Sequence, residues 1–349
     1  MSNLIIDPIT KIYMRYTNDN NELLKKTLSD MYNQSSITIA NSGLHANFLA
    51  IETIIKTNNI LNIIYPTQLY YETVNLLNSL STNIKINSFD INDNKSIINL
   101  IKNQPTILFI ESCSNPNGYI FNYDLIPKLR SLCVNLYIIC DNSWLTNYIF
   151  NPFDYLIDVV TISLTKYYSG GNCICGACII SDKNENLSIQ LDKYVHLTGI
   201  HISPLQIQLI NQSINQTESR INICSNLTKQ IINYLQKQPN LIINHPNVNK
   251  LTIDLVTQYF KNNLYTSTFT FGIKINNIIL QQILFKLTIL NIETSFGTKL
   301  TIIDNHINMI NDYSFIRISI GYEDSIDRII NGLNELFENI YNNNNHTMD

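Results

Sequence analysis

The 349-residue sequence has few charged residues: Asp, Glu, Lys and Arg make up 14% of it, where roughly 25% is usual. A formal net charge of −4 argues against a dedicated nucleic-acid surface, which needs clustered positive charge. No apolar run approaches the ~18 residues of a membrane-spanning helix, and the first residues lack the basic segment of a signal peptide. The sequence therefore predicts a soluble, cytoplasmic protein that binds neither nucleic acid nor a membrane.

A disulfide framework is also missing, because the seven cysteines are odd in number and have no framework spacing; this fits a reducing compartment. Cys173, Cys175 and Cys178 lie close together, but a zinc site needs a fourth ligand, and none is near in the sequence. We interpret these three as small buried residues of a strand and predict no metal site.

Hydrophobic residues make up 45% of the sequence, and between residues 61 and 180 apolar runs alternate with helical patterns such as Glu72–Leu80 and Asp124–Leu132. Runs that are apolar nearly throughout are typical of strands buried on both faces of a parallel sheet. These runs are Leu61–Tyr65, Thr106–Ser112, Tyr137–Cys140, Val159–Leu164 and Ala177–Ile180. The alternation predicts an α/β domain with right-handed crossovers.

The pattern changes in the last third of the chain. Ser203-Pro204 is a typical helix start, and the apolar spacing continues that helix, straight or kinked, to Leu235. Beyond Pro239 we expect strands and helices of an α+β domain. The expected strands are Leu251–Leu255, Ser267–Lys274 and Phe315–Ile320, and the expected helices are Ile278–Leu290 and Ile326–Tyr341. We predict a short N-terminal arm (1–22), a large domain (23–222) and a small C-terminal domain (223–349).

Polar residues follow the predicted parallel strands, at the edge where open α/β sheets bind ligands. Asp141 and Lys166 close two of these strands, a pairing that by itself is more often a buried ion pair. Ser163 and Thr165 add hydroxyls beside the lysine, and Asn41-Ser42-Gly43-Leu44 opens an apolar helix whose first N–H groups suit an anion. A phosphate cradle, an imine-forming lysine and a carboxylate for a ring nitrogen are the parts that pyridoxal 5'-phosphate (PLP) requires.

With these parts the chain resembles the Cys/Met-metabolism PLP-dependent enzymes, the family of cystathionine lyases and synthases and of methionine gamma-lyase. Eight segments carry the resemblance in the family's order: Tyr13–Asn18, Ser42–Leu44, Leu69-Tyr70, Glu111–Pro116, Asp141–Trp144, Ser163–Tyr167, Ser295–Gly297 and Ile316–Asp324. The resemblance implies the PLP-dependent transferase fold type I (aspartate aminotransferase-like), an α/β fold with a large, mostly parallel-sheet domain and a smaller α+β C-terminal domain.

The resemblance also implies roles for single residues. Lys166 would hold the cofactor and move protons, Asp141 would pair with the pyridine nitrogen, and Tyr70 would stack on the ring. Further cofactor contacts would come from Ser42, Gly43, Leu44, Asn115, Ser163 and Thr165, and from Tyr13 and Arg15, which would reach the phosphate of a neighbouring subunit. Arg317, Ser295 and Asn115 would bind the amino-acid substrate. A homodimer or homotetramer with shared active sites follows from the same resemblance.

Three departures from the family's pattern fall near the substrate positions. Tyr71-Glu72 replaces two glycines, Gly170–Cys173 replaces a G-H-x-D segment, and Thr294 stands where gamma-acting members often carry glutamate. We therefore predict a PLP-dependent lyase or transferase of sulfur amino-acid metabolism, with beta or gamma chemistry, elimination or replacement, and cystathionine, cysteine or homoserine-type substrates all left open. The alternatives are another PLP enzyme, such as an aminotransferase, and a catalytically weakened homologue with a binding role.

Overall fold

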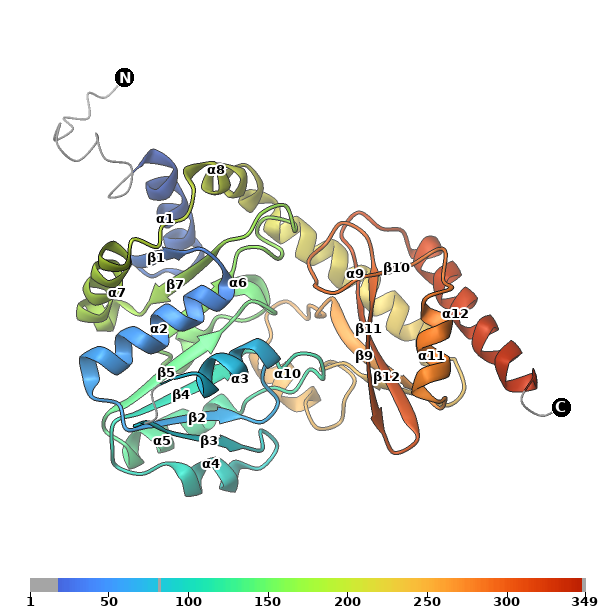
Figure 1. The fold of residues 1–349 in the computed structure, drawn as a ribbon, viewed down its shortest axis with the longest axis horizontal. Coiled ribbons are helices and arrows are strands. Elements are labelled where there is room, and N and C mark those ends of the chain that lie inside the picture. Colours follow the sequence, from blue (N-terminus) through green and yellow to red (C-terminus); the bar gives the residue numbers. More distant parts are fainter. Residues whose placement is uncertain (1–17, 81–82, 347–349) are drawn as a thin grey trace. The chain divides into compact units, whose positions relative to one another are not determined.

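A computed structural model of the chain describes residues 18–80 and 83–346, and these fold into two units (Figure 1). The first unit contains the residues up to Ser112 together with Phe121–Asn215. The second contains Cys113–Ile120 and the chain from Gln216 onward. The short segment Cys113–Ile120 thus connects two parts of the first unit but belongs to the second.

The first unit is built on a seven-stranded sheet with the strand order β1-β7-β6-β5-β4-β2-β3. Its strands are β1 (Ser36–Ala40), β2 (Asn62–Pro66), β3 (Lys85–Phe89), β4 (Thr106–Glu111), β5 (Leu136–Asp141), β6 (Val159–Ser163) and β7 (Gly176–Ile180). Strands β3, β2, β4, β5 and β6 run parallel, and β7 is antiparallel to β6 and to β1. The predicted parallel sheet is therefore confirmed, with one antiparallel strand that its apolar sequence does not distinguish.

The helices of the first unit precede β1, lie between strands of the sheet, or follow β7. They are α1 (Asp19–Tyr32), α2 (Gly43–Asn58), α3 (Tyr71–Asn78), α4 (Asn94–Leu100), α5 (Ile126–Leu132), α6 (Thr146–Ile149), α7 (Glu185–Thr198) and α8 (Pro204–Ser213). Leu49 and Ile54 of α2 share a buried apolar cluster with Ile107 of β4 and Ile139 of β5. Burial of this apolar surface holds α2, which begins beside the predicted phosphate turn, against the sheet.

The second unit has its own five-stranded sheet with the order β10-β11-β12-β9-β8. Its strands are β8 (Leu241–Asn244), β9 (Thr268–Ile273), β10 (Asn291–Ile292), β11 (Ile302–Ile310) and β12 (Tyr313–Ser319), and its helices are α9 (Thr217–Leu235), α10 (Ile253–Tyr259), α11 (Asn277–Leu284) and α12 (Ile326–His346). Phe269 and Ile316 of the sheet pack with Leu333 and Leu336 of α12 in one buried cluster. This separate core is the expected α+β arrangement.

One sequence prediction needs correction here. Leu251–Leu255 was expected to be a strand, and that prediction is wrong: the segment leads into helix α10. Leu251 is exposed, whereas Val256 and Tyr259 are buried three residues apart, which is the spacing of a helix face. The helix expected to continue, straight or kinked, to Leu235 consists of α8 and α9, with a 3₁₀ turn at Ile214–Gln216 between them. Within the described residues, no helix is long and apolar enough to span a membrane.

Candidate active site

Asp141 ends strand β5, and its carboxylate is held by two fixed hydrogen bonds. Oδ1 accepts from the backbone N–H of Ser143 at 2.9 Å, and Oδ2 accepts from Asn47 Nδ2 of helix α2 at 3.0 Å. Asn47 is buried, so its amide group is fixed by the packing of α2. The carboxylate therefore has one defined orientation at the carboxyl edge of the sheet, where ligands of such sheets bind.

The neighbours of the Asp141 carboxylate compensate its negative charge only in part. Burial raises the pKa of Asp141, while the hydrogen bonds from Ser143 and Asn47 and the charge of Lys166 act to lower it. Desolvation disfavours the ionised form of an acid, so a raised pKa indicates that these partners do not fully replace water. A protonated ring nitrogen placed against the carboxylate would supply the missing positive charge.

Helix α2 starts against the end of strand β6. Ser42 is its N-cap and accepts from the His45 N–H at 3.0 Å. A Cβ at Gly43 would lie 2.6 Å from Ser163 Cβ, and a Cβ at Gly176 would lie 2.2 Å from Ser42 O. Only glycine permits these close approaches. By helix geometry the N–H groups of residues 43 and 44 have no partner within α2, so the Ser42-Gly43 turn beside Ser163 is suited to an anion.

Lys166 lies in a compact turn after β6. Gly170 N–H donates to Lys166 O at 2.8 Å, and Gly170 and Gly171 have φ values of 65° and 80°, in the left-handed region that favours glycine. Thr165 Oγ1 donates to Cys175 O at 3.2 Å and accepts from Cys175 N–H at 3.1 Å. The Thr165 hydroxyl therefore closes the base of this turn, which fixes the backbone of Lys166.

Tyr70 precedes helix α3 and is 42% exposed. Its backbone N–H donates to Glu111 Oε1 at 2.8 Å. Glu111 is the last residue of β4, and its register partner in β5 is Asp141. The chain at Tyr70 is thus anchored to the same sheet edge as Asp141, which leaves the aromatic ring accessible.

Arg317 lies on β12 of the second unit. Its Nη1 donates to Asn115 Oδ1 at 3.1 Å, and its Nη2 forms an ion pair with Asp304 Oδ2 of the neighbouring strand β11. The exposed fractions are 13% for the arginine side chain and 8% for the aspartate. Arg317, Asn115 and Asp304 form a second polar cluster, in which a planar guanidinium suited to a carboxylate is held from two sides.

Other predicted site residues are placed as follows. Ser295 belongs to the loop between β10 and β11, where its carbonyl accepts from Ser319 Oγ at 3.1 Å. Leu44 is exposed at the start of α2. Tyr13 and Arg15 lie outside the described residues. The structure brings Ser42, Gly43 and Ser163 together, Asp141 into electrostatic range of Lys166, and Asn115 against Arg317.

Sequence reasoning did not assign Asn47 or Asp304. Asn47 lies one helical turn beyond Gly43, on the same face of the helix. This spacing could have identified Asn47 as a candidate site residue. Asp304 follows two apolar residues of β11, Ile302 and Ile303, and it is buried, so its carboxylate needs a cationic partner. Its partner Arg317 is 13 residues away, so only the strand register identifies the pair.

The model of the family described as "Cys/Met metabolism PLP-dependent enzyme" matches residues 7–338. The chain belongs to this family. The PLP cofactor predicted from the sequence is thereby confirmed. The donor set fits the cofactor, because the Ser42-Gly43 turn suits a phosphate and the buried Asp141 carboxylate suits a protonated ring nitrogen.

Curated relatives are distant in sequence. L-methionine gamma-lyase of Fusobacterium nucleatum subsp. polymorphum is 23% identical over 232 residues, which is 66% of this chain and 58% of that protein. Cystathionine gamma-synthase of Escherichia coli strain K12 is 22% identical over 237 residues, or 67% of this chain and 60% of that protein. The chain thus spans less than two thirds of the length of these relatives.

Solved structures share the fold over most of the chain. Cystathionine gamma-lyase from Lactobacillus plantarum, complexed with L-serine, has a TM-score of 0.82 and 20% identity, covering 94% of this chain and 88% of that one. Cystathionine gamma synthase from Xanthomonas oryzae pv. oryzae, in complex with cystathionine, has a TM-score of 0.81 and 19% identity, covering 94% and 87%. The predicted fold type I is therefore confirmed.

Proposed function

We propose that the chain is a PLP-dependent lyase or transferase that acts on sulfur-containing or homoserine-type amino acids by beta- or gamma-elimination or replacement. The observation that carries the proposal is the Asp141 carboxylate, fixed by Asn47 and Ser143 in the field of Lys166. Membership of the Cys/Met family supplies the reaction class. The names of the relatives, methionine gamma-lyase and cystathionine gamma-synthase, supply the substrate class.

PLP, when bound, takes up the electron pair that remains on the Cα atom of an amino acid after its proton leaves. The Asp141 carboxylate, whose hydrogen bonds are already fixed, would keep a proton on the ring nitrogen without reorganising. Lys166 Nζ would hold the cofactor and would then move protons between substrate carbons. The N–H groups at the start of α2, together with Ser163, would hold the phosphate. The Tyr70 ring would face the cofactor ring.

The second cluster binds the substrate. Arg317 holds the α-carboxylate with the planar donor fork of its guanidinium, which carboxylates match in geometry. Asp304 and Asn115 keep that fork in one orientation, and Ser295 adds a contact from the loop before β11. Beta chemistry needs only removal of the Cα proton, whereas gamma chemistry also needs a proton to leave Cβ. Lys166 Nζ serves both steps.

The test is to purify the protein with PLP, record its visible spectrum, and screen cystathionine, cysteine, methionine and O-acylated homoserines for release of keto acid and ammonia. Lys166→Ala should lose the visible band of attached PLP and all turnover. Lys193→Ala, an exposed lysine of α7, is the matched control and should keep both. Full activity in Lys166→Ala would refute the assignment.

The same assay separates the two alternative functions. An aminotransferase would release at most about one keto acid per cofactor, without ammonia, unless an acceptor keto acid is added. A binding homologue would keep the PLP spectrum but show no spectral change with any amino acid. One curated relative, an L-alanine/L-glutamate racemase of Wolbachia pipientis wMel, is 25% identical over 222 residues, so racemisation of these two amino acids belongs in the screen.

We further propose a homodimer or homotetramer with shared active sites, as the resemblance at Tyr13 and Arg15 implies. We also propose a cytoplasmic location. All seven cysteines lie in the described part of the chain, where none forms a disulfide and all are buried. Cysteines that are not joined in disulfides are typical of a reducing compartment.

A further inference from the structure

The loop between β10 and β11, residues 293–301, has a backbone conformation that contacts with other segments must stabilise. We call it the Ser295 loop. Ser295 has a φ of 107° and Gly297 a φ of 70°. A serine in this region is strained, and the conformation persists only where the surrounding structure determines it. The contacts that hold the loop are therefore part of how Ser295 is presented.

The turn that follows β12, residues 320–324, lies directly against this loop. Tyr322 N–H donates to Thr298 O at 3.2 Å, and Glu323 N–H donates to Lys299 O at 2.8 Å. A Cβ at Gly321 would lie 2.3 Å from the carbonyl carbon of Leu300. The two backbones thus touch, and a side chain at residue 321 would force them apart.

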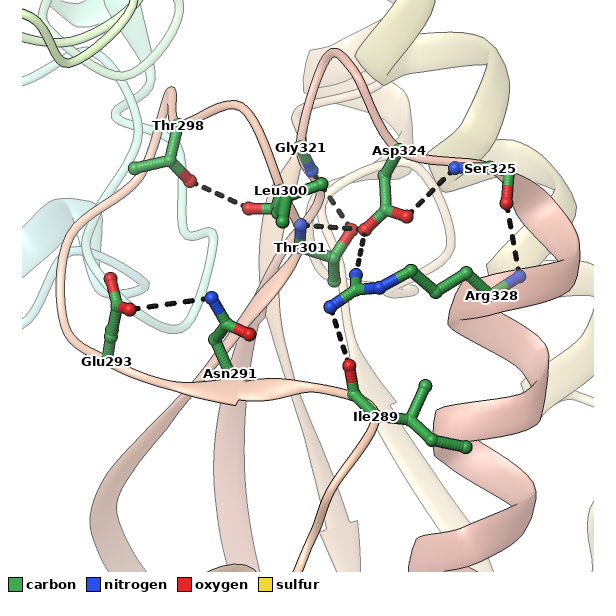
Figure 2. A network of polar contacts seen from close by, with 10 residues as sticks. All are labelled: Ile289, Asn291, Glu293, Thr298, Leu300, Thr301, Gly321, Asp324, Ser325 and Arg328. Atoms are coloured by element: carbon green, nitrogen blue, oxygen red, sulfur yellow. Dashed lines mark hydrogen bonds and ion pairs between the residues drawn. The ribbon is translucent and has the colours of Figure 1, made fainter.

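One side chain ties this arrangement together. Asp324 Oδ2 accepts from Thr301 N–H at 2.8 Å and from Arg328 Nη1 at 2.7 Å, and Oδ1 accepts from Ser325 N–H at 2.9 Å. Arg328 Nη2 donates onward to Ile289 O at 2.5 Å. Figure 2 shows Asp324 between the end of the loop and the first turn of α12, with Arg328 reaching back to the segment before β10.

This carboxylate is engaged by protein groups. The Asp324 side chain is 0% exposed, while Arg328 is 28% exposed. Three donors already occupy the Asp324 carboxylate oxygens. Asp324 therefore acts on other residues of this unit and not on a substrate.

The loop is also coupled to the strand that carries Arg317. Ser319 Oγ donates to Ser295 O at 3.1 Å. Because side chains two residues apart on a strand point to the same face, Ser319 and Arg317 lie on one side of β12. The position of Ser295 relative to the guanidinium thus depends on how the loop is held at its other end, where Asp324 receives the Thr301 N–H.

We propose that Asp324, oriented by Arg328, is a positioning residue that fixes the Ser295 loop and thereby sets affinity for the amino-acid substrate. This inference rests on the proposed function, because it assigns a specificity role to the loop beside Arg317. Asp324 takes no part in the cofactor chemistry of the first unit. Its loss changes KM and leaves kcat and the PLP spectrum in place.

The test compares Asp324→Asn with Glu335→Gln. Glu335 lies on the same helix, α12, and also holds backbone N–H groups, those of Thr288 at 3.0 Å and Ile289 at 3.1 Å. It therefore controls for the loss of a carboxylate cap that does not contact the loop. Asp324→Asn should raise KM about tenfold, the effect of losing one charged hydrogen bond, with kcat and visible band retained. Glu335→Gln should leave KM unchanged.

Hydrogen exchange of the backbone provides a readout that needs no turnover. Asp324→Asn should accelerate exchange in residues 293–301, and Glu335→Gln should not. The proposal is overturned if exchange in the loop is unchanged in Asp324→Asn, or if both variants raise KM equally. If the wild-type protein turns over no amino acid, the proposed function fails, while faster loop exchange still supports the positioning role and unchanged exchange still overturns it.

Discussion

His245 shows, at the scale of a single residue, how burial decides a charge state. Its Nε2 donates to Thr266 O at 2.9 Å, and its Nδ1 accepts from Asn247 N–H at 3.1 Å. The ring stacks on Tyr265 and meets Phe269 edge-on. A second proton would have to sit on Nδ1, facing an N–H donor. Burial, opposed by the hydrogen bond to Thr266, lowers the pKa of His245 to about 4.

The lowered pKa of His245 predicts acid sensitivity. The folded state binds fewer protons at His245 than the unfolded chain does. The stability that depends on a neutral His245 ring is therefore fully present above pH 6.5 and is lost as the pH falls toward 4. At pH 5 the loss should be about 2 kcal/mol of unfolding free energy. Urea unfolding at pH 7 and pH 5 measures it. His245→Asn should remove this part of the pH dependence, and the exposed His196→Asn should retain it; equal pH dependence in all three proteins would contradict the account.

Single residues were predictable from sequence where a local pattern marks them. Asp141 and Lys166 follow apolar strands, and Ser42 precedes an apolar helix, so chain position alone suggests their chemistry. The partners that give these residues their properties were not predictable. Asn47 meets Asp141 across 94 residues, and Asp304 meets Arg317 through strand register. Such contacts exist only after the sheet has formed.

At the scale of elements, the start of helix α2 is the part that we propose to hold the phosphate of the cofactor. Ser42 accepts the His45 N–H, and this bond sets the direction of the N–H groups at residues 43 and 44. Helix α8 has the same device, because Ser203 accepts the Leu205 N–H at 3.3 Å. Helix α8 carries none of the proposed cofactor residues, so Ser203 is a natural control.

Ser42→Ala and Ser203→Ala should each cost about 1 kcal/mol of stability through loss of an N-cap. Only Ser42→Ala should also weaken PLP binding, by about tenfold, because the phosphate donors lose their alignment. Urea unfolding of the cofactor-free variants gives the first quantity, and titration with PLP, followed by visible absorption, gives the second. Equal PLP affinity in the two variants would show that α2 does not hold the phosphate.

The elements themselves were predictable to different degrees. Strands β4, β5 and β6 are apolar over most of their length, which identifies them directly. Strand β3, Lys85–Phe89, is partly exposed and carries lysine and asparagine, so no apolar run marks it. Leu251–Leu255 contains alternating apolar residues, yet the burial of Val256 and Tyr259, three residues apart, favours a helix. Local alternation was outweighed there by tertiary packing.

At the scale of the whole molecule, the chain divides into two units between Asn215 and Gln216, while the predicted domain limit at residue 222 stays a prediction. What the sequence did not indicate is that Cys113–Ile120 belongs to the second unit. This segment carries Asn115, which contacts Arg317. Asn115, which was predicted to bind both cofactor and substrate, thus lies in a short segment between Ser112 and Phe121 that belongs to the second unit.

Exposed leucines on helices α1 and α8 of the first unit are relevant to the proposed homo-oligomer. Helices α1 and α8 are tied together by Asn211 Nδ2, which donates to Asn20 O at 2.9 Å. Both helices nevertheless expose leucines: Leu23 is 53% exposed and Leu205 is 65% exposed. Large apolar side chains exposed on neighbouring helices are a feature of protein interfaces. A second copy of the chain is the partner that shared active sites require.

Leu205→Asp and Leu23→Asp should therefore shift the protein from an oligomer toward the mass of one chain, because a buried unpaired carboxylate at an interface costs several kcal/mol. Turnover should fall with the oligomer, since each shared site would lose its neighbour. Sedimentation velocity measures the mass, and the keto-acid assay measures the turnover. Val134→Asp, at a position that is 80% exposed and remote from both helices in the sequence, should change neither. A wild-type protein that sediments as a single chain with full activity would exclude the shared site, and with it any contribution of Tyr13 and Arg15 to a neighbouring phosphate.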